Sequence, residues 1–192
     1  MKNWNVLYDQ VMTCLKEKLV PQLTYHHWKH TEYVVQMAEY IACQEHCSEE
    51  EILLVKTAAL FHDAGFVNPI TDSHEEEGIR FAQKMLPEYG YSKNEIALII
   101  GMIYATKIPQ KPANKLECIL ADADLEYLGT ANFKHIGNSL FQELKHENPH
   151  LTIEEWNTIQ IKFLQEHVYH TSYCLKNRAE KKEKNLGLLL QS

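Results

Sequence analysis

The sequence lacks the features of a membrane or secreted protein. No apolar run approaches the roughly 18 residues that a transmembrane helix needs. The first residues, Met1 to Asn5, lack the charged start and following apolar run of a secretory signal. Cysteine is scarce, and its five residues are odd in number and scattered, which favours reduced thiols over a disulfide framework. We therefore expect a cytoplasmic protein with no membrane partner.

Positive charge is also in short supply. The 19 lysine and arginine residues are outnumbered by 26 acidic residues, which gives a net charge of −7. This balance disfavours contact with a nucleic-acid backbone, although a small nucleotide can still bind a local basic patch. Apolar residues make up 45% and charged residues 23%, as in ordinary soluble globular proteins. With 192 residues, the chain fits one domain, and we expect no nucleic-acid partner.

Alternation of apolar and polar residues, the pattern of a half-buried strand, is missing as well. Apolar residues instead recur every three or four positions, beginning with the segment 4–19 before Pro21. Four Ser/Thr-x-x-Glu capping boxes mark helix starts: Ser48 with Glu51, Ser73 with Glu76, Ser92 with Glu95 and Thr152 with Glu155. The sequence predicts an all-α fold with further helices at about 30–46, 49–62, 73–86, 92–105, 114–128, 132–146 and 152–176.

The predicted helix 49–62 is apolar almost all round, which indicates a central position in a bundle. His62 and Asp63 are then expected at the end of a buried helix. At the C-terminus, the basic run 178–184 precedes the apolar residues 186–190. This segment forms a last helix on the core, a contact between two copies of the chain, or a solvated charged turn before a short apolar helix. We favour the turn.

The pair His62 and Asp63 has the side chains of a metal site. Neighbouring residues on a regular helix point about 100° apart, so both reach one ion only where the helix ends. Gly65 is the residue type expected just beyond a helix C-terminus, and the carbonyl end of a helix favours a cation. The local sequence therefore predicts a bound ion at the end of this helix.

Two further segments carry matching donors. His30 opens the predicted helix 30–46, and Asp122 and Asp124 interrupt an otherwise apolar stretch at 119–125. A buried carboxylate without a partner costs several kcal/mol, so each acid must be exposed, paired or bound to an ion. Because the two acids are two residues apart on a helix, one fits the ion better than the other. Imidazole and carboxylate donors suit Mn, Mg, Ni, Co, Fe or Zn.

This combination resembles the HD-domain superfamily of metal-dependent phosphohydrolases, whose pattern is a histidine, then His-Asp, then a distant Asp on one divalent metal. The resemblance covers about residues 20–135, and its sharpest part is the apolar run that leads into His62-Asp63-Ala64-Gly65. It implies a single-domain helical bundle of the HD/phosphodiesterase type over 1–192. The motif core would occupy 20–135, and C-terminal helices would occupy 152–192.

The resemblance also implies the ligand set. Asp124 is preferred over Asp122 because Leu125 follows it, as in the Asp-Leu that ends the phosphodiesterase ligand set. The implied metal ligands are His30, His62, Asp63 and Asp124.

Roles for two more histidines follow from the resemblance. The segment from Tyr25 to His30 looks like the tyrosine, general-acid histidine and metal-binding histidine of cyclic-nucleotide phosphodiesterases, so His26 and Asp63 are the expected catalytic residues. His26 would share a helix face with His30 if the helix extended that far back, and His27 is the rival for the acid. His74 corresponds to an extra ligand of two-metal relatives. We expect it to hold a second metal or a substrate phosphate, or else only to open its helix.

The loop after the predicted helix 92–105 offers candidate substrate contacts. The hydroxyl of Thr106 and the ammonium of Lys107 suit a phosphate. A lysine at this position also stabilises a helix C-terminus, so both interpretations of Lys107 stay open.

The expected function is therefore that of a metal-dependent phosphohydrolase. It would use a metal-activated water to cleave a phosphate ester of a nucleotide or a similar small molecule. One alternative is a non-catalytic sensor that binds a nucleotide or a metal, since one fold hosts many functions. The other is an HD-type di-iron oxygenase, which needs more histidine ligands than His74 alone supplies.

Overall fold

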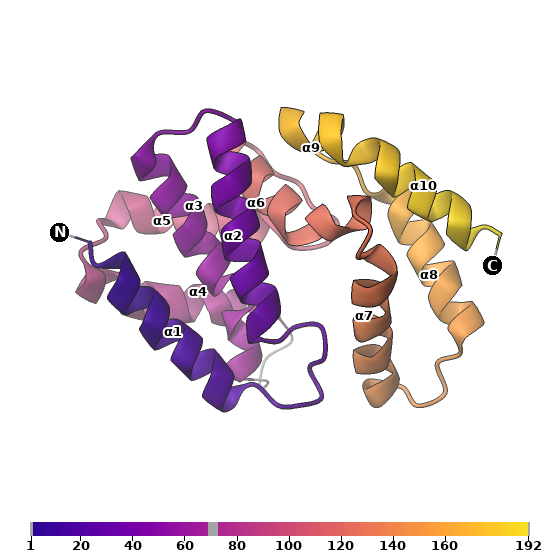
Figure 1. Cartoon of the computed structure of the whole chain (residues 1–192). Coiled ribbons are helices and arrows are strands. Elements are labelled where there is room, and N and C mark those ends of the chain that lie inside the picture. The colour runs from indigo at the N-terminus through magenta and orange to yellow at the C-terminus, as the bar shows by residue number, and fades with distance from the viewer. Residues whose placement is uncertain (1, 69–72, 192) are drawn as a thin grey trace.

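The structure is a computed structural model that describes residues 2–68 and 73–191, and every regular element in these residues is helical (Figure 1). The prediction of an all-α fold is confirmed. The α-helices are α1 (Trp4–Lys18), α2 (Trp28–Gln44), α3 (Glu49–Phe61), α4 (His74–Met85), α5 (Lys93–Ala105), α6 (Lys115–Leu125), α7 (Phe133–Glu147), α8 (Ile153–Glu166), α9 (Ser172–Asn177) and α10 (Ala179–Leu189). Short 3₁₀ turns are η1 (Ala64–Val67), η2 (Leu86–Tyr89) and η3 (Glu126–Gly129).

Helix starts lie where the capping signals predicted them. Complete capping boxes open α3, α5 and α8, where a serine or threonine and the glutamate three residues later satisfy each other's backbone donors. At α4 the Ser73 hydroxyl accepts from the backbone of Glu76, while its own proton goes to Glu75. Each cap stabilises its helix by about 1 kcal/mol.

Helix α3 runs through the middle of the region α1–α6. It packs on α2, α5 and α6 and also contacts α1 and α4. Leu60 and Phe61, in its last turn, are completely buried, and burial of such side chains contributes about 1.5–3 kcal/mol each. The prediction that this helix is central is confirmed. Its C-terminal end lies inside the protein rather than at the surface.

Helices α7, α8 and α10 form a second group beside α1–α6 (Figure 1). Helix α10 packs on α8 and on η3, whereas α7 and α8 meet mainly through large side chains, with Phe141 stacked on Trp156 at a ring-centroid distance of 6.1 Å. Large side chains keep the backbones of these two helices apart. A cavity lies between the two helices and the end of α3.

The predicted helix 152–176 is wrong, because the chain leaves the helix at His167 and starts again at Ser172. The cause is Asp122, which is completely buried. Its carboxylate accepts hydrogen bonds from the backbone of His170 (2.9 Å) and of Thr171 (2.8 Å) and from the Thr171 hydroxyl (2.6 Å). Residues in a continuous helix could not offer these backbone donors, since their N–H groups would be engaged within the helix.

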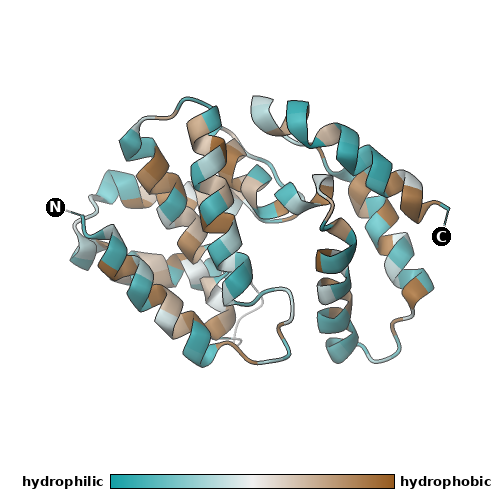
Figure 2. Cartoon of the chain, viewed as in Figure 1, coloured by the Kyte–Doolittle hydropathy of each residue, from teal (hydrophilic) through white to brown (hydrophobic). Residues whose placement is uncertain are grey.

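The favoured interpretation of the basic run 178–184 as a solvated turn is also wrong. The run forms most of α10, whose first turns carry hydrophilic residues and whose C-terminal end carries hydrophobic ones (Figure 2). Lys182 is buried, and its ammonium donates to the backbone carbonyl oxygens of Leu164 (3.0 Å) and His167. This lysine therefore ties α10 to the last turn of α8.

Among residues 2–68 and 73–191, no helix combines the length and hydropathy that crossing a bilayer requires.

Candidate metal centre

The end of α3 aims two neighbouring side chains at one point. His62 keeps helical backbone angles (φ −56°, ψ −42°), and Asp63 leaves them (φ −106°, ψ 4°). The change of direction brings the His62 Nε2 atom to within 3.1 Å of Asp63 Oδ2. The expectation that adjacent residues meet where the helix ends thus agrees with the geometry.

Gly65 plays a different part from the one expected. It does not end α3 in a left-handed conformation but lies in η1, against the start of α4. A Cβ at Gly65 would lie 1.9 Å from the backbone oxygen of His74, and one at Gly78 would lie 2.5 Å from the backbone oxygen of Phe61. Both glycines are needed because the two backbones touch, and this contact places His74 next to Asp63.

Four donor atoms gather at the end of α3. The ligand atoms of His30, His62 and Asp124 lie within 4.8 Å of one another. His30 Nε2 is 3.1 Å from Asp124 Oδ1 and 3.4 Å from Asp63 Oδ2. Bonds of about 2.0–2.2 Å to one ion place neighbouring donors about 3 Å apart, which matches these separations. The structure brings together all four residues that the resemblance implied, whereas the Asp122 carboxylate is engaged elsewhere, with His170 and Thr171.

The protonation of His62 tests whether a cation fits. Its Nδ1 is 2.7 Å from the backbone oxygen of Ala59, which can only accept, so Nδ1 carries the proton. In its neutral form the ring presents a lone pair at Nε2 to the carboxylates. Within the described residues, neither His62 Nε2 nor Asp63 Oδ2, both buried, has a hydrogen-bond partner. Buried acceptors that face one another are unfavourable unless a proton or a metal cation lies between them, and this set of nitrogen and oxygen donors fits a divalent ion.

The electrostatics indicate the same need for positive charge. Burial raises the pKa of Asp124, but the hydrogen bond with His30 and the nearby His62 ring outweigh it and hold this pKa at about 2. Burial also raises the pKa of Asp63, yet the facing His62 ring holds it well below its usual range. In His62, burial lowers the pKa, and the two carboxylates raise it by more. Both acids are thus ionised at neutral pH.

Comparison with known proteins identifies the family of this chain. The HD domain family model matches residues 27–126, which is just over half of the chain. The chain belongs to the HD domain family. A solved structure with a similar fold is that of a predicted HD superfamily hydrolase from an uncultured Thermotogales bacterium. It has a TM-score of 0.56 and 20% sequence identity, and the match covers 82% of this chain and 88% of that one. No curated protein matches the sequence.

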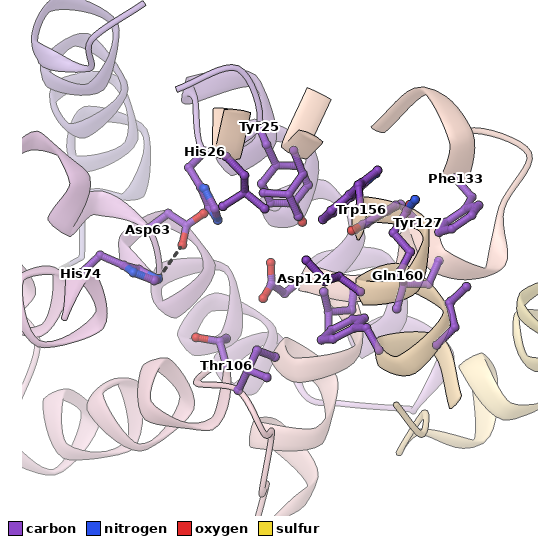
Figure 3. Close-up of a pocket in the computed structure, with 18 of the residues that line it drawn as sticks. Tyr25, His26, Asp63, His74, Thr106, Asp124, Tyr127, Phe133, Trp156 and Gln160 are labelled. Atoms are coloured by element: carbon purple, nitrogen blue, oxygen red, sulfur yellow. Dashed lines mark ion pairs between the residues drawn. The ribbon is translucent and has the colours of Figure 1, made fainter. Parts of the chain in front are cut away.

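A cavity of about 240 Å³ opens onto this cluster of candidate metal ligands (Figure 3). Its lining includes Asp63 and Asp124 from the cluster, together with His26, His74 and Thr106. The remaining wall is largely apolar and comes from the segment 125–133 and from α7 and α8.

His26 lines this cavity but does not lie on a helix. Helix α2 starts at Trp28, and His27, the rival for the general acid, caps it by accepting from the backbone of Lys29 at 2.9 Å. The Nδ1 atom of His26 hydrogen-bonds to the carboxylate of Glu143 on α7. Burial lowers the pKa of His26, but the bond to Glu143 and the nearby Asp63 raise it by more. The net result is a pKa above the usual value.

Glu143 is a site residue that the sequence interpretation missed. Its carboxylate also accepts from the backbone N–H groups of Tyr25 (2.8 Å) and His26 (3.0 Å), and it is buried. A signal for it exists: Glu143 is three residues after Leu140, so it interrupts the apolar stripe of its helix. The sequence near Glu143 does not indicate its partner, because His26 lies 117 residues away.

His74 is the first residue of α4, and its Nε2 is 3.6 Å from Asp63 Oδ1 and 3.5 Å from Glu75 Oε1. Its ring stacks on Phe66 at a centroid distance of 4.2 Å. Burial lowers the pKa of His74 despite the two acids, so a lone pair is available at neutral pH. These contacts suit a second ion that shares Asp63 with the first.

The two substrate contacts predicted in the loop after α5 differ in their placement. Thr106 lines the cavity, but its hydroxyl donates to the backbone oxygen of Ile103 at 2.8 Å. Lys107 is exposed and lines a separate hollow with Tyr104 and Glu117. We therefore withdraw the assignment of Lys107 to substrate phosphate, because its side chain faces another surface.

Proposed function

We propose that this HD-domain protein is a metal-dependent phosphohydrolase that cleaves a phosphate ester of a small molecule. The observation that carries the proposal is a buried set of facing ligand atoms, led by His62 Nε2 and Asp63 Oδ2, next to a cavity that Asp63 and His26 line. Such a site combines an electrophile with a proton donor, and these are the two requirements for breaking a P–O bond.

Four residues would hold the ion: His30, His62, Asp63 and Asp124. The chemistry that a divalent cation supplies when bound there is acidification of a water molecule and withdrawal of charge from a phosphoryl oxygen. His74 and Asp63 would hold a second ion or orient the phosphate. The donor set is compatible with Mn, Fe, Ni, Co, Zn and Mg.

His26 would protonate the departing oxygen. With Nδ1 donating to Glu143, the free Nε2 atom of the ring is directed away from this carboxylate. Its raised pKa keeps a larger share of His26 in the acid form near neutral pH. Glu143 also accepts hydrogen bonds from the backbone of the segment that carries His26, so it would hold the His26 ring in one orientation.

Metal analysis and a substrate screen test the proposal together. The purified protein is loaded with Mn, Mg, Ni, Co, Fe or Zn, and the release of phosphate from a panel of mono- and diesters is measured. We expect one or two ions per chain and turnover of at least one ester class, both lost on chelation. The exposed His135 on α7 supplies a control, because His135→Ala should change neither result.

The same screen identifies the alternative functions. Binding of Mn or Ni without cleavage of any ester would overturn the hydrolase and favour a sensor. Two irons per chain with consumption of oxygen would overturn it in favour of a di-iron oxygenase.

A further inference from the structure

The cavity has two chemically different ends. His26, Asp63 and His74 lie together at one end, Asp124 lies between the ends, and Tyr127 lies at the other (Figure 3). Phe133 and Trp156 lie at the Tyr127 end, and the lining that α7 and α8 contribute is mostly aliphatic and aromatic: Leu140, Leu144, Trp156, Ile159, Phe163 and Leu164. A phosphate at the metal end would therefore place its organic group among apolar residues.

The lining offers little to a molecule that carries several charges. None of the described residues around the cavity is a lysine or an arginine, whereas Asp63, Glu75 and Asp124 are acids. The metal centre can neutralise one phosphate. Further phosphates, as in a nucleoside di- or triphosphate, would meet carboxylates without any side-chain cation to offset them.

The polar groups at the apolar end are few, and most are already engaged. The rings of Tyr25 and Tyr127 pack edge to face with centroids 5.8 Å apart, and their hydroxyl groups interact with each other. Two groups remain: the indole N–H of Trp156 and the amide of Gln160, whose nitrogen lies 3.5 Å from Asn157 Oδ1. A nucleobase carries several donors and acceptors that must be matched when they are buried, and one amide and one indole N–H are too few to match them.

We propose, on the basis of the hydrolase function above, that the substrate is the phosphate monoester of an apolar alcohol rather than a nucleotide. The phosphate lies at the metal end, and the apolar group fills the space between α7 and α8. In the reaction, water adds its oxygen to phosphorus, the P–O bond to the alcohol breaks, and the alcohol oxygen takes the proton of His26. The attacking water releases one proton to solvent, and His26 takes up one proton from solvent before the next turnover. The products are the free alcohol and inorganic phosphate. The volume of about 240 Å³ is below the usual size of a drug-sized site, so the alcohol is small.

The test compares esters whose leaving groups are all primary alcohols. With Mn fixed, kcat/KM is measured for 2-phenylethyl phosphate, n-hexyl phosphate, adenosine 5′-monophosphate and ribose 5-phosphate. We expect the two apolar esters to exceed both polar ones by at least about tenfold. Higher kcat/KM for adenosine 5′-monophosphate would overturn this inference and leave the hydrolase intact. If none of the esters tested in either screen is cleaved, the hydrolase itself fails.

A matched pair of variants locates the apolar site. Ile159 lines the cavity, and Ile153 on the same helix does not; their exposures are 48% and 47%. Because both side chains are half exposed, neither change should prevent folding. We expect Ile159→Ser to raise KM for 2-phenylethyl phosphate about fivefold with little change in kcat, and Ile153→Ser to leave KM unchanged. Equal behaviour of the two variants would place the organic group outside this cavity and overturn the inference.

A third variant asks whether a base is bound there instead. Gln160→Leu should leave kcat/KM for 2-phenylethyl phosphate unchanged or higher, because it removes a polar group from an apolar site. A selective loss of activity on adenosine 5′-monophosphate, with ribose 5-phosphate unaffected, would show that this amide binds a base and would overturn the inference.

Discussion

The region α1–α6 and the region α7–α10 contribute to the same cavity in different ways. In the first region, the candidate ligands come from short motifs at helix ends, such as His62-Asp63 after α3 and His74 at the start of α4. In the second region, α7 and α8 supply an apolar wall and one carboxylate, Glu143. The reactive groups thus follow from local sequence, whereas the shape of the site depends on contacts between distant segments. Substitutions in the two regions should therefore have different effects.

The largest effect is expected in the first region. His62→Ala or Asp63→Ala removes a donor at the centre of the cluster, so tight metal binding and turnover should both be abolished. Metal content per folded chain and phosphate release measure the two losses, with His135→Ala as the control. Full metal content in either variant would contradict the assignment of that residue as a ligand.

The next effect concerns the proton donor. His26→Ala should lower kcat by about 10²–10⁴-fold, as for loss of a general acid, and should leave the ion in place. The readouts are kcat with a fixed metal and metal content by elemental analysis. If metal is lost together with activity, His26 belongs to the ligand set instead.

The link between the two regions is tested at Asp122. Asp122→Ala leaves the buried donors of His170 and Thr171 without an acceptor, which should cost about 2–4 kcal/mol of unfolding free energy. Urea unfolding measures the loss, and Asp122→Asn, which retains one acceptor oxygen, should lose less. A change below about 0.5 kcal/mol would show that the loop 167–171 is held by other contacts.

A smaller effect with a defined sign is expected in the second region. Glu143→Gln removes the carboxylate that raises the pKa of His26, whereas burial, which lowers this pKa, remains. The pKa of His26 should therefore fall, and the alkaline limb of the pH–rate profile should move to lower pH, because a general acid must be protonated. We expect kcat at neutral pH to fall about 10- to 100-fold.

The control for that variant lies one turn further along α7, where Glu147 is exposed. Glu147→Gln should leave the pH–rate profile unchanged. An equal fall in kcat for Glu143→Gln at every pH, without a shift of the limb, would indicate that Glu143 only supports the backbone of the His26 loop.

The smallest effect is expected at Lys107, which faces away from the cavity. Lys107→Ala should leave KM and kcat within about twofold of the unsubstituted protein, because no contact with substrate is removed. A KM raised more than tenfold, measured on the best substrate of the screen, would restore this lysine as a phosphate contact.

The features that could be predicted from the sequence are those that depend on residues close together in the chain. Helix starts followed from capping residues such as Ser48, and the meeting of His62 with Asp63 followed from the geometry of a helix end. The break at 167–171 could not be predicted in this way, because no glycine or proline marks it and its cause, Asp122, is nearly fifty residues away. The burial of Lys182 in a basic run has the same origin, since the carbonyl groups that bind it belong to α8 and to the residue that follows it.

The contact between η1 and α4 determines the spacing between Asp63 and His74 in the candidate metal centre. Gly65 and Gly78 leave no gap for a methyl group, so the spacing between Asp63 and His74 depends on backbone atoms that press against each other. Substitutions elsewhere in the core can change the side chains around this point without altering that spacing. The placement of His74 beside Asp63 is thus set by main-chain contact rather than by the packing of side chains.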